Sequence, residues 1–116
     1  MSVPHAIDYV EFTVRDLAEA KRFFSAALGW AFTDYGPTYA GIRSGDGEMG
    51  GLTVADEVRT GGPLVVVTSD DLEASQRAVE AAGGTISTPP FGFPGGRRFH
   101  FLDPSGNELA VASYDE

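Results

Sequence analysis

The feature that most constrains the fold of this chain is an internal repeat. The segment YVEFTVRDL, which ends at Leu17, returns as LVVVTSDDL, which ends at Leu72, 55 residues later. Two glycines, Gly29 and Gly84, follow at the same offset. An apolar run that ends in Asp is typical of a strand followed by a helix N-cap, and glycine often ends a helix. Each half is therefore predicted to open with a strand, a helix and a glycine stop.

The first half is predicted to continue with three more strands. Along its first strand apolar and polar residues alternate, which puts Val10, Phe12 and Val14 on one face and Tyr9 and Glu11 on the other. The predicted elements are a strand at 7–14, a helix from Leu17 capped by Asp16, and strands at 30–32, 39–43 and 49–54, the last two joined by a hairpin turn at 44–47.

The second half is predicted to repeat this order after a polar connector at residues 55–63. Residues 88–96 hold three prolines and three glycines, which predicts a long loop that acts as a lid or cavity rim. The predicted elements are a strand at 64–68, a helix capped by Asp70 or Asp71 and stopped at 83–84, strands at 85–87, 97–102 and 107–113, and a tight turn at 103–106.

These elements predict an α+β fold of two βαβββ modules. We expect them to form one curved, mostly antiparallel sheet with the helices on its outer face. At 116 residues the length suits one domain, residues 1–116, with the repeat at about 5–55 and 63–114. The second module would extend the helix-facing side with apolar residues at Val65, Val67, Leu109 and Val111.

Composition excludes several classes of function. The net charge of −9 argues against nucleic acid or an anionic membrane as a partner, because both need clustered Lys and Arg. Without cysteine the chain has no disulfide, thiolate nucleophile or sulfur metal ligand. No apolar run approaches the roughly 18 residues of a membrane-spanning helix, and the N-terminus does not read as a signal peptide. We therefore expect a cytoplasmic protein.

Two motifs carry a resemblance to a known family. The Asp-Leu helix starts and the Asp-Pro-Ser-Gly-Asn turn at 103–107 make the chain similar to the vicinal oxygen chelate superfamily, which includes glyoxalase I, extradiol dioxygenases, fosfomycin-resistance enzymes and bleomycin-resistance binding proteins. The runs at 9–12, 32–37 and 93–101 resemble those of small bacterial glyoxalase-like proteins. The resemblance covers nearly the whole chain and implies a homodimer. The cavity could lie within one chain or across two.

The same resemblance predicts that no metal is bound. Metal-dependent relatives carry ligands on the first and last strands of each module, and those positions look like Tyr9, Gly51, Leu64 and Ala110 here. Leucine, glycine and alanine side chains offer no lone pair, and a catalytic metal typically needs about three protein ligands. We expect no metal and no cofactor, which removes metal stabilisation of an enediolate and metal activation of oxygen.

Few polar residues are candidates for a site. His100 alternates with two phenylalanines and should face the concave side, either as a hydrogen-bonded structural histidine or as a ligand contact or proton carrier. Glu11 and Glu108 could act as acid and base or bind a cation, or could form structural ion pairs with Arg97, Arg98 or His100. His5 precedes the first strand and is interpreted as a surface residue.

Aromatic residues are the strongest indication of a site. One group lies in the first half, and a second lies in the proline- and glycine-rich segment at 88–96. Either these residues belong to the core, or they line a site for a planar organic molecule. They are Trp30, Phe32, Tyr35, Tyr39, Phe91 and Phe93.

The leading hypothesis is metal-free binding of a small aromatic or planar ligand in a concave cavity. Trp30, Tyr35, Phe91 and Phe93 would stack on the ligand. Tyr39 would line the cavity, and Tyr9, Glu11 and His100 would orient the ligand. The alternative is a metal-independent isomerase or lyase in which Glu11 or His100 carries a proton and Tyr9 steadies an oxyanion. A third reading is a protein-binding module with a filled cavity and an exposed apolar patch.

Overall fold

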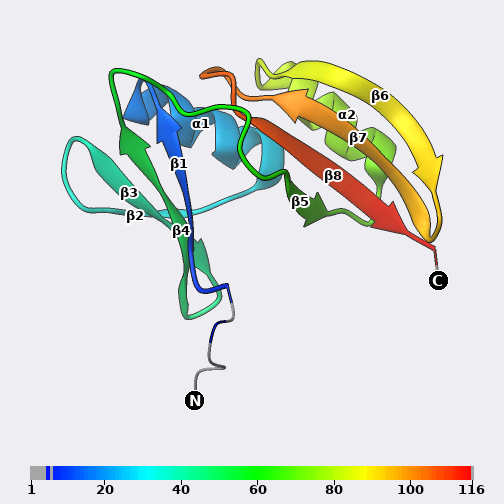
Figure 1. Cartoon of the computed structure of the whole chain (residues 1–116), viewed down its shortest axis with the longest axis horizontal. Coiled ribbons are helices and arrows are strands. Elements are labelled where there is room, and N and C mark those ends of the chain that lie inside the picture. Colours follow the sequence, from blue (N-terminus) through cyan, green and yellow to red (C-terminus); the bar gives the residue numbers. More distant parts are fainter. Residues whose placement is uncertain (1–4, 6, 116) are drawn as a thin grey trace.

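The structure, a computed structural model that describes residue 5 and residues 7–115, contains two βαβββ modules (Figure 1). The N-terminal module comprises β1 (Val10–Val14), α1 (Leu17–Leu28), β2 (Phe32–Asp34), β3 (Tyr39–Ser44) and β4 (Gly47–Val54). The C-terminal module comprises β5 (Val65–Thr68), α2 (Leu72–Ala81), β6 (Thr85–Phe93), β7 (Gly96–Leu102) and β8 (Glu108–Tyr114). The predicted α+β fold with a repeated module is confirmed.

Each module forms its own four-stranded sheet, so the expected single sheet is divided in two. The strand orders are β1-β4-β3-β2 and β5-β8-β7-β6. In each sheet the first and last strands of the module pair in parallel, and the other neighbours are antiparallel. The register also repeats: Glu11 lies opposite Gly51 on β4, and Val66 lies opposite Ala110 on β8. Corresponding positions of the two modules can therefore be compared directly.

Both helices begin at the predicted aspartates. The Asp16 carboxylate accepts from the Glu19 N–H at 2.9 Å, and the Asp71 carboxylate accepts from the Ala74 N–H at 3.0 Å. These bonds satisfy amide groups that have no partner inside the helix. Of the two aspartates considered for the second cap, the structure uses Asp71. Among the described residues, no helix is long and apolar enough to cross a membrane.

The strand predicted at 30–32 is displaced toward the C-terminus, because Trp30 belongs to the end of α1. Gly29 adopts a left-handed conformation with φ of 73°. The Trp30 N–H then donates to the Phe24 carbonyl oxygen at 3.3 Å, and the indole stacks on the Phe24 ring at 4.8 Å between centroids. This helix-ending motif brings an apolar residue back onto the last turn. The strand starts at Phe32 as a result.

The predicted loop at 88–96 is wrong: β6 runs on to Phe93, and a tight turn leads into β7. The strand pairs antiparallel with β7, with register shifts between Ile86 and Thr88 and between Thr88 and Phe91. Pro89 and Pro90 lie within the second irregular stretch. Proline is tolerated there because β6 is an edge strand, and because a bulge interrupts the backbone hydrogen bonds to β7 that a proline could not donate. The proline and glycine content therefore signalled a bulged edge strand.

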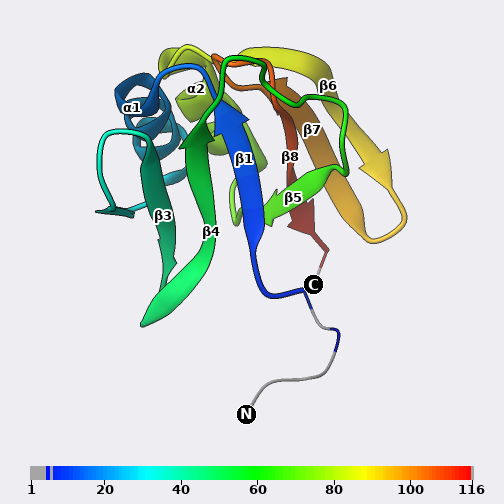
Figure 2. The ribbon, with the colours of Figure 1, turned by 60° about the vertical axis from the view of Figure 1, so that its left-hand side comes forward.

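A shared core joins the modules through the helices. The α1 and α2 helices lie side by side (Figures 1 and 2). Phe23 of α1 contacts Phe101 of β7, with ring centroids 6.0 Å apart, and also packs edge-on against Phe24 at 5.0 Å. All three phenylalanines are buried. The apolar faces of both sheets therefore pack around one pair of helices.

The turn between β7 and β8 forms a second connection between the modules. The buried Asn107 side chain donates to the Thr13 carbonyl oxygen at 2.8 Å and to the Asp103 carboxylate at 3.0 Å. The Asp103 carboxylate also accepts from the backbone N–H groups of Ser105 and Asn107. Burial raises the pKa of Asp103, and these hydrogen bonds oppose the increase. The Asp-Pro-Ser-Gly-Asn motif therefore has a structural role: it holds the end of β1.

Candidate ligand-binding faces

Each sheet has one face that packs against the helices and a second that we call the open face. On β1, Phe12 and Val14 pack toward the core, whereas Glu11 is exposed on the other side. On β7, Phe99 and Phe101 are fully buried, and Arg98 and His100 alternate with them. Polar and aromatic side chains gather on both open faces.

The N-terminal open face carries a hydrogen-bonded group that we call the tyrosine network. The Tyr9 and Tyr39 hydroxyl oxygens lie 2.7 Å apart, and the Tyr39 hydroxyl donates to the Glu11 carboxylate at 2.9 Å. Beside them the Tyr35 hydroxyl donates to Glu48. Tyr9, Glu11, Tyr35 and Tyr39, which were predicted from the sequence, come together here. Glu48 was not predicted.

The hydrogen bonds give the tyrosine network a direction. Because the Tyr39 proton is used in the bond to Glu11, Tyr9 must be the donor to Tyr39. The remaining lone pairs belong to the Tyr9 hydroxyl and the Glu11 carboxylate, which are acceptors. The network therefore offers hydrogen-bond acceptors and negative charge, which suits a ligand with a hydroxyl or ammonium group.

The same contacts raise two tyrosine pKa values. Desolvation is the largest cause of the raised pKa of Tyr39, followed by its hydrogen bonds to Tyr9 and Glu11. The pKa of Tyr35 is raised mainly by its hydrogen bond to Glu48. Both phenols therefore remain protonated, and remain donors to carboxylates, at neutral pH.

Two glycines form the floor beneath the tyrosine network. Gly41 and Gly51 lie opposite each other on β3 and β4. A Cβ atom on Gly51 would lie 2.2 Å from the Tyr39 hydroxyl oxygen and 2.8 Å from that of Tyr9. A Cβ atom on Gly41 would lie 2.4 to 2.8 Å from the Glu48 carboxyl group. The glycines thus allow the phenols and the carboxylate to lie directly on the sheet.

A divalent metal does not fit the residues at the expected ligand positions. Gly51 has no donor, and the space above it is occupied by the Tyr9 and Tyr39 hydroxyl groups. The equivalent residue of the second module is Ala110, which is buried and also lacks a donor. Between Ile7 and Asp115, and at His5, no three His, Asp or Glu side chains come together as a metal site. Metal-free binding of a ligand therefore stays a prediction.

The C-terminal open face carries a second group, which we call the arginine cluster: Phe91, Phe93, Arg98, His100 and Glu108. The Arg98 guanidinium carbon lies 5.5 Å from the Phe91 ring centroid and 5.6 Å from that of Phe93. Phe91 also approaches the His100 ring at 5.8 Å. Cations positioned over phenyl faces at such distances are attracted by the ring quadrupole. Two rings therefore hold the arginine in place.

Glu108 orients His100 within the arginine cluster. The His100 Nδ1 atom lies 3.3 Å from the Glu108 carboxylate, which also accepts from the Ser87 hydroxyl at 3.0 Å. Because a carboxylate accepts, Nδ1 carries the proton. The other ring nitrogen, Nε2, is buried and has no hydrogen-bond partner among the described residues, and the same is true of Arg98 Nε. Both are buried polar atoms whose hydrogen-bonding capacity is unused among the described residues.

Not every residue expected at the site lies on an open face. Trp30 packs on Phe12 and Phe24 in the core. Phe91 and Phe93 lie on the open face, but on a strand rather than a lid loop. His5 is exposed, as expected for a surface residue.

The partners of the charged groups were only partly predicted from the sequence. Arg97 was considered as a partner for Glu11 or Glu108 but pairs with Glu73 of α2 at 2.8 Å. Arg98 was considered in the same way, yet it makes no ion pair within the described chain. Alternation along β7 places Arg98 on the His100 face, and this signal could have identified it. Its contact with two phenylalanines depends on the pairing of β6 with β7.

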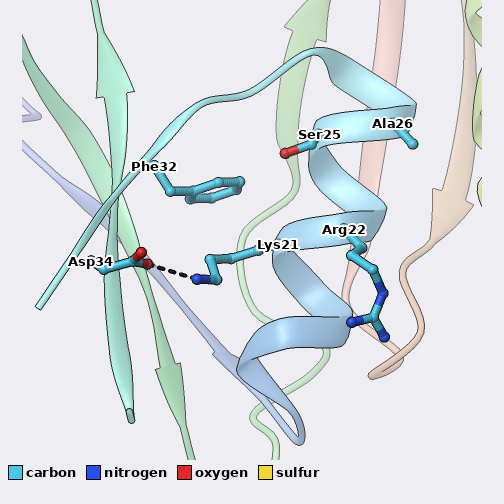
Figure 3. Close-up of a pocket in the computed structure, with 6 residues that line it drawn as sticks. All are labelled: Lys21, Arg22, Ser25, Ala26, Phe32 and Asp34. Atoms are coloured by element: carbon cyan, nitrogen blue, oxygen red, sulfur yellow. Dashed lines mark hydrogen bonds and ion pairs between the residues drawn. The ribbon is translucent and has the colours of Figure 1, made fainter. Parts of the chain in front are cut away.

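A separate hollow of about 660 Å³ lies on the other side of the N-terminal module, between α1 and β2 (Figure 3). Lys21 and Asp34 meet across it in an ion pair of 2.7 Å. The Ser25 hydroxyl at its wall donates to the Trp30 carbonyl oxygen. Lys21 and Asp34 satisfy each other, and Phe32 is the one aromatic site candidate among the residues that line the hollow.

Comparison with known proteins places the fold in a family. The sequence profile of the Glyoxalase family, described as "Glyoxalase/Bleomycin resistance protein/Dioxygenase superfamily", matches residues 6–111. The chain is 30% identical to "Anthracycline biosynthesis protein DauV" of Streptomyces sp. (strain C5) over 98% of its own length. It spans only 43% of that relative.

Solved structures share the fold at lower identity. A glyoxalase-related enzyme from Fulvimarina pelagi aligns with a TM-score of 0.80 at 21% identity, covering 94% of this chain and 88% of that one. TnmS3, an antibiotic binding protein from Streptomyces sp. CB03234, aligns with a TM-score of 0.72 at 23% identity, covering 99% of both chains. Likenesses at this level of identity establish the fold alone.

Proposed function

We propose that this chain, a member of the glyoxalase/bleomycin resistance protein/dioxygenase superfamily, binds a small organic molecule without a metal. The molecule is planar and aromatic. The observation that carries the proposal is that both open faces present aromatic rings beside hydrogen-bonding groups. Phe91 is 36% exposed and Tyr35 is 59% exposed, so these rings are available to a ligand. A planar molecule gains from stacking on such surfaces, and a few polar groups fix its orientation.

The relatives support this class of ligand. One similar protein is described as an anthracycline biosynthesis protein and another as an antibiotic binding protein. Anthracyclines are planar, polycyclic molecules with oxygen substituents. We therefore propose that the ligand is a polycyclic aromatic compound of this shape.

The proposal includes a homodimer. The outer edges of β1 and β5 have no strand partner among residues 7–115. Apolar side chains are exposed beside them, including Tyr9, Leu64 and Val66. Exposed edges of this kind are usually covered by another chain or another segment. Native mass spectrometry of the purified protein should give a dimer; a monomer at micromolar concentration would exclude this part of the proposal.

A fluorescence titration with the anthracycline doxorubicin tests the binding function. Stacking against protein aromatic rings should quench the ligand fluorescence in a saturable manner. Replacing both Phe91 and Phe93 with alanine should weaken binding by about tenfold or more, since each aromatic contact is worth roughly 1 kcal/mol. Lys21→Ala, at the separate hollow, should leave the affinity unchanged. Equal effects of the two variants, or no saturable binding of any polycyclic probe, would contradict the proposal.

The geometry of His100 favours one alternative function, a metal-independent isomerase or lyase. The Glu108 carboxylate holds the imidazole through Nδ1 and leaves Nε2 without a hydrogen-bond partner among the described residues, and an imidazole oriented in this way can take a proton from a substrate that reaches it. Glu11, the other proton-carrier candidate, already accepts from Tyr39. In an enzyme, His100→Ala should abolish turnover and Glu11→Gln should lower it, while ligand affinity is retained. Loss of affinity without any turnover to lose supports the binding protein.

A further inference from the structure

We propose that Arg98 forms a subsite for an anionic oxygen beside His100, and that the ligand therefore carries a carboxylate on its planar aromatic ring. This inference rests on the proposed function and specifies the chemistry of the ligand at one of the two open faces. It adds Arg98, a residue that the sequence suggested only as an ion-pair partner, as the residue that selects the ligand by charge.

The position of Arg98 is fixed by its neighbours. On β7 its cross-strand partners are Phe91 of β6 and Ala112 of β8. The guanidinium lies over both the Phe91 and Phe93 rings, and the small, buried Ala112 leaves room beneath it. Rings above a guanidinium plane do not use its N–H groups, which point outward along the plane edge. The contacts therefore orient the donors without satisfying them.

Arg98 lacks the carboxylate partner that a partly buried arginine normally has. No Asp or Glu among the described residues lies within 4.0 Å of it, and its Nε is buried without a hydrogen bond. The adjacent Arg97 points to the other face and pairs with Glu73. An unpaired cation and an unsatisfied donor in a half-buried site are unfavourable. An anionic ligand would pair with the cation through a charge-assisted bond to the terminal N–H groups of the guanidinium, which have no partner among the described residues.

His100 provides a second nitrogen on the same face. Residues two apart on a strand point the same way and lie roughly 6.5 Å apart, so one ligand group can lie between Arg98 and His100. The His100 Nδ1 atom is bonded to the Glu108 carboxylate, and its Nε2 atom is buried without a partner among the described residues. Phe91, which touches both side chains, supplies a surface for the attached aromatic ring.

The two open faces differ in charge, because the tyrosine network holds two carboxylates whereas the arginine cluster holds one guanidinium and one carboxylate, Glu108. The tyrosine network offers acceptors and the Glu11 and Glu48 carboxylates, so it repels an anionic group. The arginine cluster contains the unpaired guanidinium. The tyrosine network repels a carboxylate and the Arg98 guanidinium attracts it, so a carboxylate is expected at the C-terminal open face.

Two tricyclic probes of the same shape test the inference. Anthraquinone-2-carboxylate and the neutral anthraquinone-2-carboxamide present the same rings to the protein. Isothermal titration calorimetry at pH 7 should give about tenfold tighter binding of the carboxylate, the gain expected from a charge-assisted pair. In Arg98→Gln the carboxylate should lose that advantage, while the carboxamide affinity stays the same. Arg98→Lys should restore part of the preference, because the charge returns without the planar fork.

Arg97→Gln is the matched control. It removes the same charge from the neighbouring residue, which faces α2, so the preference for the carboxylate should persist. Equal losses in the Arg97 and Arg98 variants would overturn the subsite, because they would report only the net charge. Equal affinities of the two probes for the unmodified protein would also overturn it. If neither probe binds, the proposed function itself fails, and this outcome is distinct from the other two.

A second measurement needs no variant. The Arg98 Nε–H resonance of 15N-labelled protein should shift on addition of anthraquinone-2-carboxylate and should stay in place with the carboxamide. A shift of the same size with both probes, or with neither, contradicts a direct contact between the carboxylate and Arg98 even if calorimetry detects binding.

Discussion

The two open faces of this molecule are built on the same module and yet have opposite chemistry. The tyrosine network of the N-terminal module consists of phenols and carboxylates, and its free groups are acceptors. The arginine cluster of the C-terminal module consists of phenylalanines around a guanidinium and an imidazole, and the guanidinium is a donor without a partner. Strand order is the same in both modules, and so is the register of the parallel strand pair in each.

The difference arises at equivalent positions of the last strand. In the N-terminal module Gly51 leaves space for two phenol hydroxyl groups against the sheet. In the C-terminal module Ala110 fills that space with a methyl group and lies opposite His100 on β7. A methyl group at Gly51 would clash with the Tyr39 and Tyr9 hydroxyl groups, so the tyrosine network needs glycine at this position. The shared fold of the modules fixes where the side chains stand, and the side chains at those positions determine which ligand groups each face can bind.

The largest expected effect is a difference in stability between a substitution on the helix-facing side of the sheets and the same substitution on an open face. Phe23→Ala should lower the free energy of unfolding by about 4 kcal/mol, because it leaves a cavity between α1 and Phe101 in the core shared by both modules. Phe91→Ala makes the same chemical change on an open face and should cost about 1 kcal/mol. Urea unfolding, followed by circular dichroism and by the fluorescence of Trp30, measures both. If circular dichroism and Trp30 give different midpoints, the modules do not share one cooperative core.

The next effect tests the glycine floor. Gly51→Ala should cost about 2 kcal/mol, because the new methyl group forces the Tyr39 and Tyr9 hydroxyl groups to move. Gly62→Ala is the control, since its Cβ atom would meet nothing within 4 Å. The Arg98 Nε–H resonance should not change in either variant if the two open faces are independent. A shift of that resonance in Gly51→Ala would connect the faces.

Removing one hydroxyl group tests the centre of the tyrosine network. Tyr39→Phe should cost about 1 kcal/mol at pH 7, the typical value for one hydrogen bond. The folded-state pKa of Tyr39 is raised, so its contribution to stability is fully present below pH 10 and is lost as the pH rises through the folded pKa. The alkaline loss of stability should therefore be less steep in Tyr39→Phe than in the unmodified protein. Tyr114→Phe, at an exposed tyrosine outside the tyrosine network, should retain the original slope.

The smallest effect on stability comes from the edge of the tyrosine network. Glu48→Gln should change the free energy of unfolding by less than about 0.5 kcal/mol, because Tyr35 is largely exposed. The substitution should nevertheless lower the pKa of Tyr35, since the hydrogen bond to Glu48 is the main reason that this pKa is raised. An NMR titration of the tyrosine ring resonances measures the shift. An unchanged Tyr35 titration would show that the contact with Glu48 does not persist in solution.

Much of the fold could be predicted because the signals are local. Asp16 and Asp71 cap helices through bonds to residues three positions away, and Gly29 ends α1 through its own backbone conformation. The alternation on β1 separates Phe12 from Glu11 without reference to any other strand. The errors occurred where tertiary contacts override a local signal: Trp30 folds back on Phe24, and Pro89 and Pro90 are accommodated because β6 is an edge strand.

The sequence alone determined the repeated module, the helix boundaries, the side of each strand that faces the core, and the absence of donor side chains at Gly51, Leu64 and Ala110. Those properties depend on residue type and on spacing along one strand or helix. Only the tertiary structure decided that Tyr39 meets both Tyr9 and Glu11, that Arg98 lies over Phe91 and Phe93, and that Asn107 binds the end of β1. These contacts join residues on different strands, and strand pairing and register fix them.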